Sequence, residues 1–167
     1  DEVSKEYWMI VTTRDYAGGV LKRYTSTDLS TWANTGVFYR NTEGSYNMEC
    51  ASLILYNGYY YLSFSEQGTG NDRVVHYRYT SNLDNGFTVP EVDSFDGWGF
   101  YAGRIEKMED RLILSGWVAT KTLSIDLGTY IWGGNLVNHE LIQKPNGQLG
   151  VKLLSEIDEK LSHEVNY

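Results

Sequence analysis

The chain has 167 residues and a net charge of −8, and its 22% charged and 41% hydrophobic residues are typical of one globular domain. The acidic charge argues against a nucleic acid or an anionic membrane as partner, because either would require a basic patch. The single cysteine excludes an internal disulfide and a cysteine-based zinc site, and no apolar run is long enough to span a membrane.

The first feature along the chain is a repeat of strand-like segments. The segments "YWMIVTT", "YYYLSFS" and "RLILSGW" begin at residues 7, 59 and 111, so the interval is 52 residues in both cases. The shared text "RYTS" begins at Arg23 and Arg78, and a three-residue loop insertion explains its slightly longer offset. A repeated β unit of about fifty residues is the signature of a propeller blade.

The expected strands fall into three units separated by turn residues such as Asn57 and Gly58. They cover residues 7–13, 19–25 and 36–39, then 52–56, 59–65, 74–80 and 87–90, then 100–108, 111–117, 131–141 and 149–154. Apolar residues at helical spacing after residue 153 predict a short helix or the start of a linker. We therefore expect an all-β partial β-propeller of about three four-stranded antiparallel blades over residues 1–153, and a linker or short helix over 154–167. The propeller is expected to be partial because closed propellers usually have four to eight blades, and this chain holds about three.

Glu49 is the first candidate for chemistry. It stands beside Cys50, directly before the apolar run "ASLIL". A carboxylic acid in a partly apolar cleft has a raised pKa and is able to donate a proton near neutral pH. Propellers place such groups at the central channel, at the ends of inner strands. The alternative interpretation is a solvated loop glutamate, since most glutamates are exposed.

The segment "DGWGFYAGRI" is the second candidate. Tyr101 follows Glu49 by 52 residues, so the two occupy equivalent positions in successive units and are expected at the same channel. Trp98 and Tyr101 are candidates for a sugar platform or a hydrogen-bond partner of Glu49, and the alternative is an aromatic cluster at a hairpin rim. Arg14 and Asp15 are expected in a solvated loop. No pair among the three histidines has metal-ligand spacing and no glycine-rich phosphate loop occurs, so neither a metal nor a cofactor is expected.

These motifs, in this order, resemble glycoside hydrolase family 32, the β-fructosidases that include invertases, inulinases and levanases. "EYWMIVTTRDYAGGVLKRYTSTDLSTW" is similar to the family's Trp-x-Met-Val and Ser-x-Asp-Leu-x-x-Trp stretch, "MECASL" to its Glu-Cys-Pro motif, "GFYAGRI" to its Asp-Phe-Tyr-Ala segment, and "DRLILSGWV" to its Arg-Ile-Leu-Ile-Gly-Trp strand. "WGGNLVNHELIQKPNGQLGVKLLSEID" resembles the segment that closes the propeller.

The resemblance implies a five-bladed propeller with a funnel-shaped site and a fructoside substrate of the sucrose, inulin or levan type. Carried over, the general acid/base of the retaining two-step mechanism is Glu49. Cys50 is then its packed neighbour and not a nucleophile. Tyr101, Trp98 and Trp117 are the residues expected to bind the carbohydrate.

Three departures from the family pattern limit this expectation. No Asn-Asp-Pro motif is present to supply the nucleophile, no Arg-Asp-Pro motif precedes residue 7, and Ala51 and Gly99 replace a proline and an aspartate. We therefore expect roughly blades three to five of the family domain, inactive alone, with open sheet edges that favour self-association or pairing with the missing half. The alternatives are a non-catalytic carbohydrate-binding module and a related five-bladed glycosidase for arabinosides or xylosides.

Overall fold

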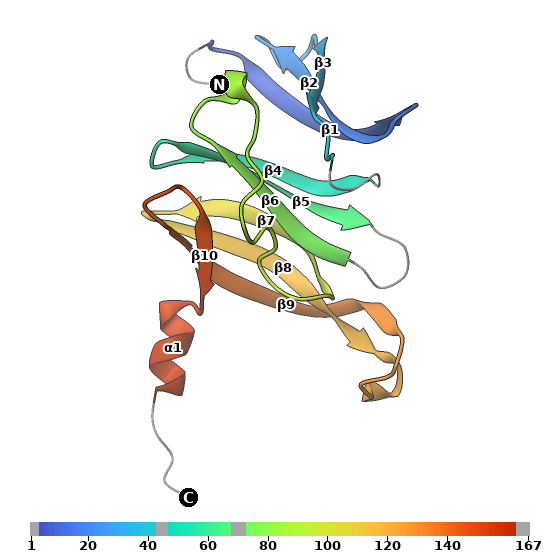
Figure 1. The fold of residues 1–167 in the computed structure, drawn as a ribbon, viewed down its shortest axis with the longest axis vertical. Coiled ribbons are helices and arrows are strands. Elements are labelled where there is room, and N and C mark those ends of the chain that lie inside the picture. Colours follow the sequence, from blue (N-terminus) through green and yellow to red (C-terminus); the bar gives the residue numbers. More distant parts are fainter. Residues whose placement is uncertain (1–3, 43–46, 68–72, 163–167) are drawn as a thin grey trace, which may run out of the picture.

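The computed structural model describes residues 4–42, 47–67 and 73–162, which form three antiparallel sheets that follow one another along the molecule in chain order (Figure 1). The strands are β1 (Tyr7–Asp15), β2 (Gly18–Ser26) and β3 (Ala33–Tyr39) in the first sheet; β4 (Met48–Tyr56), β5 (Tyr59–Gln67) and β6 (Arg73–Thr80) in the second; and β7 (Phe100–Met108), β8 (Arg111–Lys121), β9 (Tyr130–Gln143) and β10 (Leu149–Lys152) in the third. The all-β partial propeller predicted from the repeat is confirmed.

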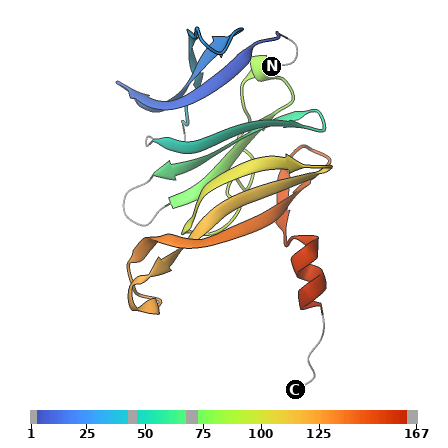
Figure 2. The same ribbon diagram turned by 180° about the vertical axis from the view of Figure 1, so that it is seen from behind.

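Two short 3-10 turns and a helix complete the described chain. The turns are Leu83–Asn85 and Thr122–Ser124, and the helix is α1 (Ser155–Leu161). Seen from behind, α1 extends beyond the third sheet (Figure 2). A hydrogen-bonded ion pair of 2.7 Å between Arg111 of β8 and Glu156 ties α1 to that sheet. Of the linker predicted over 154–167, residues 163–167, which include His163, lie outside the described residues. No helix in the described ranges is long and apolar enough to cross a membrane.

In the described chain only the third sheet has four strands. The prediction of a four-stranded blade was therefore wrong for the second unit. There, the segment expected as a strand over 87–90 makes only an isolated bridge between Thr88 and Tyr79, and a second bridge joins Ser94 to His76. Pro90 lies between these bridges and has no N–H to donate to a continuous ladder.

The second sheet is buried on both faces, which explains the apolar character of β5. Alternate side chains point to opposite faces of a strand. Leu62 and Phe64 pack in the cluster shared with the first sheet, while Tyr61 packs with Ile105 and Leu114 of the third. The serines between them are also buried, and Ser63 meets the Ser52 hydroxyl at 2.9 Å between the oxygens. Ser52 in turn accepts from the Ile105 backbone N–H at 3.1 Å, which joins β4 to β7.

Gly116 marks the tightest packing in the third sheet. A Cβ added there would lie 2.7 Å from Cζ of Phe100 and 2.9 Å from the carbonyl oxygen of Tyr101. Since Phe100 is buried, we expect Gly116→Ala to lower the free energy of unfolding by about 1–3 kcal/mol. Gly133→Ala is the matched control because nothing lies within 4 Å of its added Cβ. Urea unfolding of both variants checks this, and equal stability of the two would contradict the crowding.

A buried polar network joins the first sheet to the second. The Arg78 side chain is 1% exposed. It donates to the Tyr39 hydroxyl and to Asp93 at 2.8 Å each, and to Asn41 at 3.0 Å. His76 lies 3.1 Å from the same Asp93 carboxylate. The second "RYTS" repeat therefore supplies a structural arginine between blades.

This network makes stability depend on pH in the acid range. Burial would raise the pKa of Asp93, but the hydrogen bond and charge of His76, together with Arg78, outweigh it and hold the pKa at about 2, against an ordinary 3.8. The stabilisation is therefore complete above about pH 4 and is lost as the pH falls toward 2. We expect the stability difference between the protein and Asp93→Asn to shrink from pH 5 to pH 2.5 in urea unfolding. A difference that stays constant over this range would show that Asp93 is not the titrating group.

Candidate functional site

Two equivalent β-bulges build the candidate site. In the second sheet the pairing jumps from Glu49–Ser65 to Ser52–Ser63, and in the third from Tyr101–Trp117 to Arg104–Ser115. The residues inside the bulges, Cys50 and Ala102, have φ of 53° and 54°, a left-handed conformation that is uncommon outside glycine. Bulges re-aim side chains and are frequent next to active sites. Glu49 therefore lies within β4, which begins four residues earlier than predicted.

The bulges bring Glu49 and Tyr101 together. The Tyr101 hydroxyl donates a hydrogen bond to Oε2 of Glu49. Tyr101 is 3% exposed, and burial followed by the bond to Glu49 raises its pKa well above 10, so the hydroxyl remains a donor at any ordinary pH. The partnership considered in the sequence for these two residues is present in the structure.

Cys50 does not have the surroundings of a reactive thiol. Burial raises its pKa above 9, and the neighbouring charge of Glu49 raises it further, while Arg104 acts in the opposite direction. Since the thiolate is the nucleophilic form, a raised pKa disfavours that role.

Aromatic side chains surround Tyr101. Its ring makes edge contacts with Trp117 at 5.8 Å and Trp132 at 5.6 Å between centroids. Tyr130 packs on Trp132 and donates its hydroxyl to the backbone carbonyl of Trp98 at 3.3 Å. Trp98 itself is 66% exposed. The structure thus places Trp117 beside the Glu49–Tyr101 pair and leaves the Trp98 side chain open to solvent.

Arg73 is a member of this cluster that the sequence reasoning missed. It begins β6, and its guanidinium carbon lies 4.4 Å from the centroid of Trp132 and 5.3 Å from that of Tyr101. No local motif marks it, because the rings it contacts belong to the next sheet.

Buried polar atoms without a hydrogen-bond partner gather at the same place. Within the described residues there are five such atoms, and four belong to residues close to the pair: Asn47, Ser65, Arg73 and Trp117. Asn47 lies two residues before Glu49, Ser65 is the strand partner of Glu49, and Trp117 is the strand partner of Tyr101. Unpaired buried polar atoms are rare in native proteins. Their concentration here marks a place where a binding partner would find hydrogen bonds.

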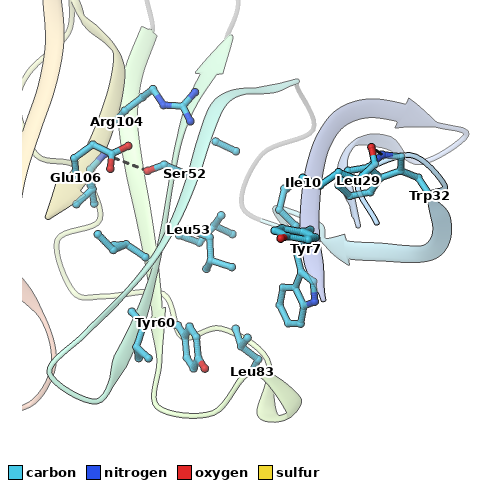
Figure 3. Close-up of a pocket in the computed structure, with 16 residues that line it drawn as sticks. Tyr7, Ile10, Leu29, Trp32, Ser52, Leu53, Tyr60, Leu83, Arg104 and Glu106 are labelled. Atoms are coloured by element: carbon cyan, nitrogen blue, oxygen red, sulfur yellow. Dashed lines mark hydrogen bonds between the residues drawn. The ribbon is translucent and has the colours of Figure 1, made fainter. Parts of the chain in front are cut away.

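A groove of about 660 Å³ lies between the first and second sheets, and its lining includes Ala51 and Ser52, which follow Glu49 in β4. Figure 3 shows Tyr7 and Ile10 of β1 across from Leu53 of β4, with Arg104 and Glu106 of β7 at one side. In the repeat, β1 corresponds to β5 and β8, which pair with the inner strands β4 and β7. Among the described residues no strand pairs with β1 on the edge that corresponds to this position.

The remaining chemical candidates have structural contacts. Arg14 and Asp15 both lie in β1, so the expected loop was wrong for both, although the Arg14 side chain is exposed. Asp15 forms a hydrogen-bonded ion pair with Arg40. His139 lies 2.9 Å from Asp96 between Nε2 and Oδ2. In the described ranges no group of three or more His, Cys, Asp or Glu side chains is arranged to hold a metal ion.

Known structures share this fold. The β-fructofuranosidase of Bombyx mori matches 97% of the chain with a TM-score of 0.74 and 20% identity. The sucrose-6-phosphate hydrolase of Lactobacillus gasseri matches 92% of the chain with a TM-score of 0.68 and 22% identity. The xylan β-1,4-xylosidase of Bacillus halodurans matches 89% of the chain with a TM-score of 0.67 and 18% identity. The chain spans 38%, 35% and 31% of these proteins.

No curated protein matches the chain significantly by sequence. Residues 1–141 match the profile of the glycosyl hydrolases family 32 N-terminal domain, the family's propeller. This match covers most of the chain without specifying which part of that propeller it represents. The chain therefore belongs to glycoside hydrolase family 32 and forms part of its fructosidase-type β-propeller domain.

Proposed function

We propose that this chain carries the general acid/base of a retaining β-fructosidase, and that this residue is Glu49. The observation that supports this most directly is the Glu49–Tyr101 hydrogen bond, with four buried polar atoms of nearby residues that have no hydrogen-bond partner among the described residues. The carboxyl group protonates the leaving glycosidic oxygen and then, as carboxylate, activates the water that releases the sugar. Tyr101 holds the carboxyl group in place, and Trp117 and Trp98 provide ring faces for the sugar.

A retaining glycosidase needs a second carboxylate about 5 Å from the first as nucleophile. We place that group outside these 167 residues, in blades that complete the ring, so that this chain represents roughly blades three to five. The unpaired edge of β1 supports this arrangement, because the equivalent strands β5 and β8 pair there with β4 and β7. Residues 1–153 then form the propeller part, and 154–167, which include α1, a linker or short helix. The free edge of β1 would otherwise favour self-association.

The substrate in this proposal is a fructoside. Relatives of the same fold include a β-fructofuranosidase in complex with sucrose and a fructan 1-exohydrolase from Cichorium intybus. A glycosidase for xylosides or arabinosides is the second candidate, favoured by the fold match to a xylosidase. A non-catalytic sugar-binding module is the third, favoured by Ala51 and Gly99 at motif positions.

A panel of sucrose, inulin, levan and aryl arabinosides and xylosides tests the proposal, with products separated by chromatography. The assay compares this chain alone with a longer protein that joins it to a nucleophile-bearing half. We expect fructose release by the longer protein only. Release of arabinose or xylose would favour the second candidate, and sugar binding without any hydrolysis would favour the third.

A further inference from the structure

We propose that Arg73 is a positioning residue for Glu49, because it holds the ring of Tyr101 in the orientation in which the hydroxyl reaches the carboxyl group. This inference rests on the proposed function of Glu49 and concerns how that side chain is held. It begins from the place of Arg73, whose guanidinium carbon lies 5.3 Å from the centroid of the Tyr101 ring. The hydroxyl of the same ring donates to Oε2 of Glu49.

The Tyr101 side chain joins two sheets, and Arg73 provides one of its two links. Glu49 and Arg73 belong to β4 and β6 of the second sheet, whereas Tyr101 belongs to β7 of the third. The two rings that contact Tyr101, those of Trp117 and Trp132, come from its own sheet. Tyr101 is therefore tied to the sheet of Glu49 at its hydroxyl by Glu49 and at its ring by Arg73. Two links fix the tilt of the ring as well as the place of its oxygen.

Arg73 is itself held by the third sheet. Its guanidinium carbon lies 4.4 Å from the centroid of Trp132, and a planar guanidinium stacks well on an aromatic face. Its backbone carbonyl oxygen accepts from the N–H of Gly99 at 3.2 Å, two residues before Tyr101 in the chain. The start of β6 is thus joined to the start of β7, so Arg73 is a fixed support for the tyrosine ring.

The charge of Arg73 acts on the rings and not on a carboxylate. Three other arginines of the described chain each pair with a carboxylate: Arg40, Arg78 and Arg111. Arg73 instead stacks on two rings, and its buried Nε has no acceptor among the described residues. Burial and then Glu49 raise the pKa of Tyr101, and Arg73 acts in the opposite direction. A cation beside a phenol favours negative charge on its oxygen, which strengthens the hydroxyl as a donor to Glu49.

Proton NMR of the 167-residue chain tests the orientation of the hydroxyl. A buried, hydrogen-bonded hydroxyl exchanges slowly with water, so its proton should give a resolved downfield signal that Tyr101→Phe removes. We expect Arg73→Met to shift this signal upfield and to speed its exchange by about 3–30-fold, the factor that corresponds to a cation–π contact. Arg73→Lys, which keeps a cation, should change it less. Arg23→Met is the matched control, because Arg23 stacks in the same way on Trp8 of the first sheet, at 4.5 Å.

Kinetics of the longer protein that carries the nucleophile provide a second readout. Arg73→Met should lower kcat for sucrose by about 3–30-fold and leave KM within about twofold, because Arg73 acts through Tyr101 and not on the sugar. In a Tyr101→Phe background the same substitution should cost little more, since the hydroxyl through which it acts is gone. Arg73→Lys should recover part of the loss.

An unchanged hydroxyl signal in Arg73→Met, or no resolved signal in the folded chain, would overturn the inference. So would an equal cost of Arg73→Met with and without the Tyr101 hydroxyl, which would show a purely structural role. Circular dichroism verifies that each variant is folded, and if Arg73→Met is not, the signal of Arg73→Lys must still move. These outcomes leave Glu49 as the acid/base, whereas full activity of Glu49→Gln would overturn the proposed function and this inference with it.

Discussion

Glu49→Gln is expected to reduce fructoside hydrolysis by about 10²–10⁴-fold in a protein that contains this chain and the second carboxylate. Glutamine cannot transfer a proton, and general acid–base catalysis contributes a factor of this size. The substitution keeps the shape of the side chain, and its amide oxygen still accepts from the Tyr101 hydroxyl, so the fold should be preserved. Initial rates with sucrose, inulin or levan measure the effect.

The leaving group provides a second, independent readout. An aryl fructoside with a weakly basic leaving group needs little protonation, so its cleavage step should suffer much less from Glu49→Gln than that of sucrose. Glu91→Gln is the matched control because Glu91 is exposed in the loop before β7. If Glu49→Gln retained full activity on sucrose, Glu49 would be a structural residue, and a binding or different glycosidase function would replace the proposal.

Arg78→Met is expected to lower the free energy of unfolding by about 3–5 kcal/mol. Removing the buried member of an ion pair costs about this much, and it leaves His76 as the remaining cationic partner of Asp93 among the described residues. The loss also leaves the Asn41 carbonyl and the Asp93 carboxylate without their bonds to the guanidinium. Since domains are usually stable by only about 5–15 kcal/mol, the effect should be clear in urea unfolding at pH 7.

A double substitution tests how much of this loss comes from leaving the charge of Asp93 without Arg78. Arg78→Met with Asp93→Asn removes both charges, so it should be more stable than Arg78→Met alone. Arg14→Met, at an exposed position, should change stability by less than about 0.5 kcal/mol. An Arg78→Met protein as stable as this control would mean that the network contributes little to the contact between the first and second sheets.

Much of the fold follows from local patterns in the sequence. The interval of 52 residues between strand segments and the turn at Asn57 and Gly58 depend on neighbouring residues along the chain, and the corresponding strands are present. The same repeat placed Glu49 and Tyr101 at equivalent positions, and from that equivalence a meeting of the two was foreseeable. The terminal helix likewise follows from spacing within a few residues.

Other features depend on contacts that no local pattern encodes. The bulges at Cys50 and Ala102 shift the pairing of whole strands, although neither residue is a glycine. The fourth strand of the second sheet is reduced to single bridges near Pro90.

The sequence by itself determined the β class, the repeated blade unit and Glu49 as the residue to examine. Only the tertiary structure decided that Tyr101 donates to Glu49, that Arg73 stacks on rings of the next sheet, and that Arg78 is a buried link between blades. The physical reason is that strand periodicity arises from the backbone geometry of consecutive residues, whereas these side-chain partners lie 15 to 59 positions apart and meet only when the sheets pack.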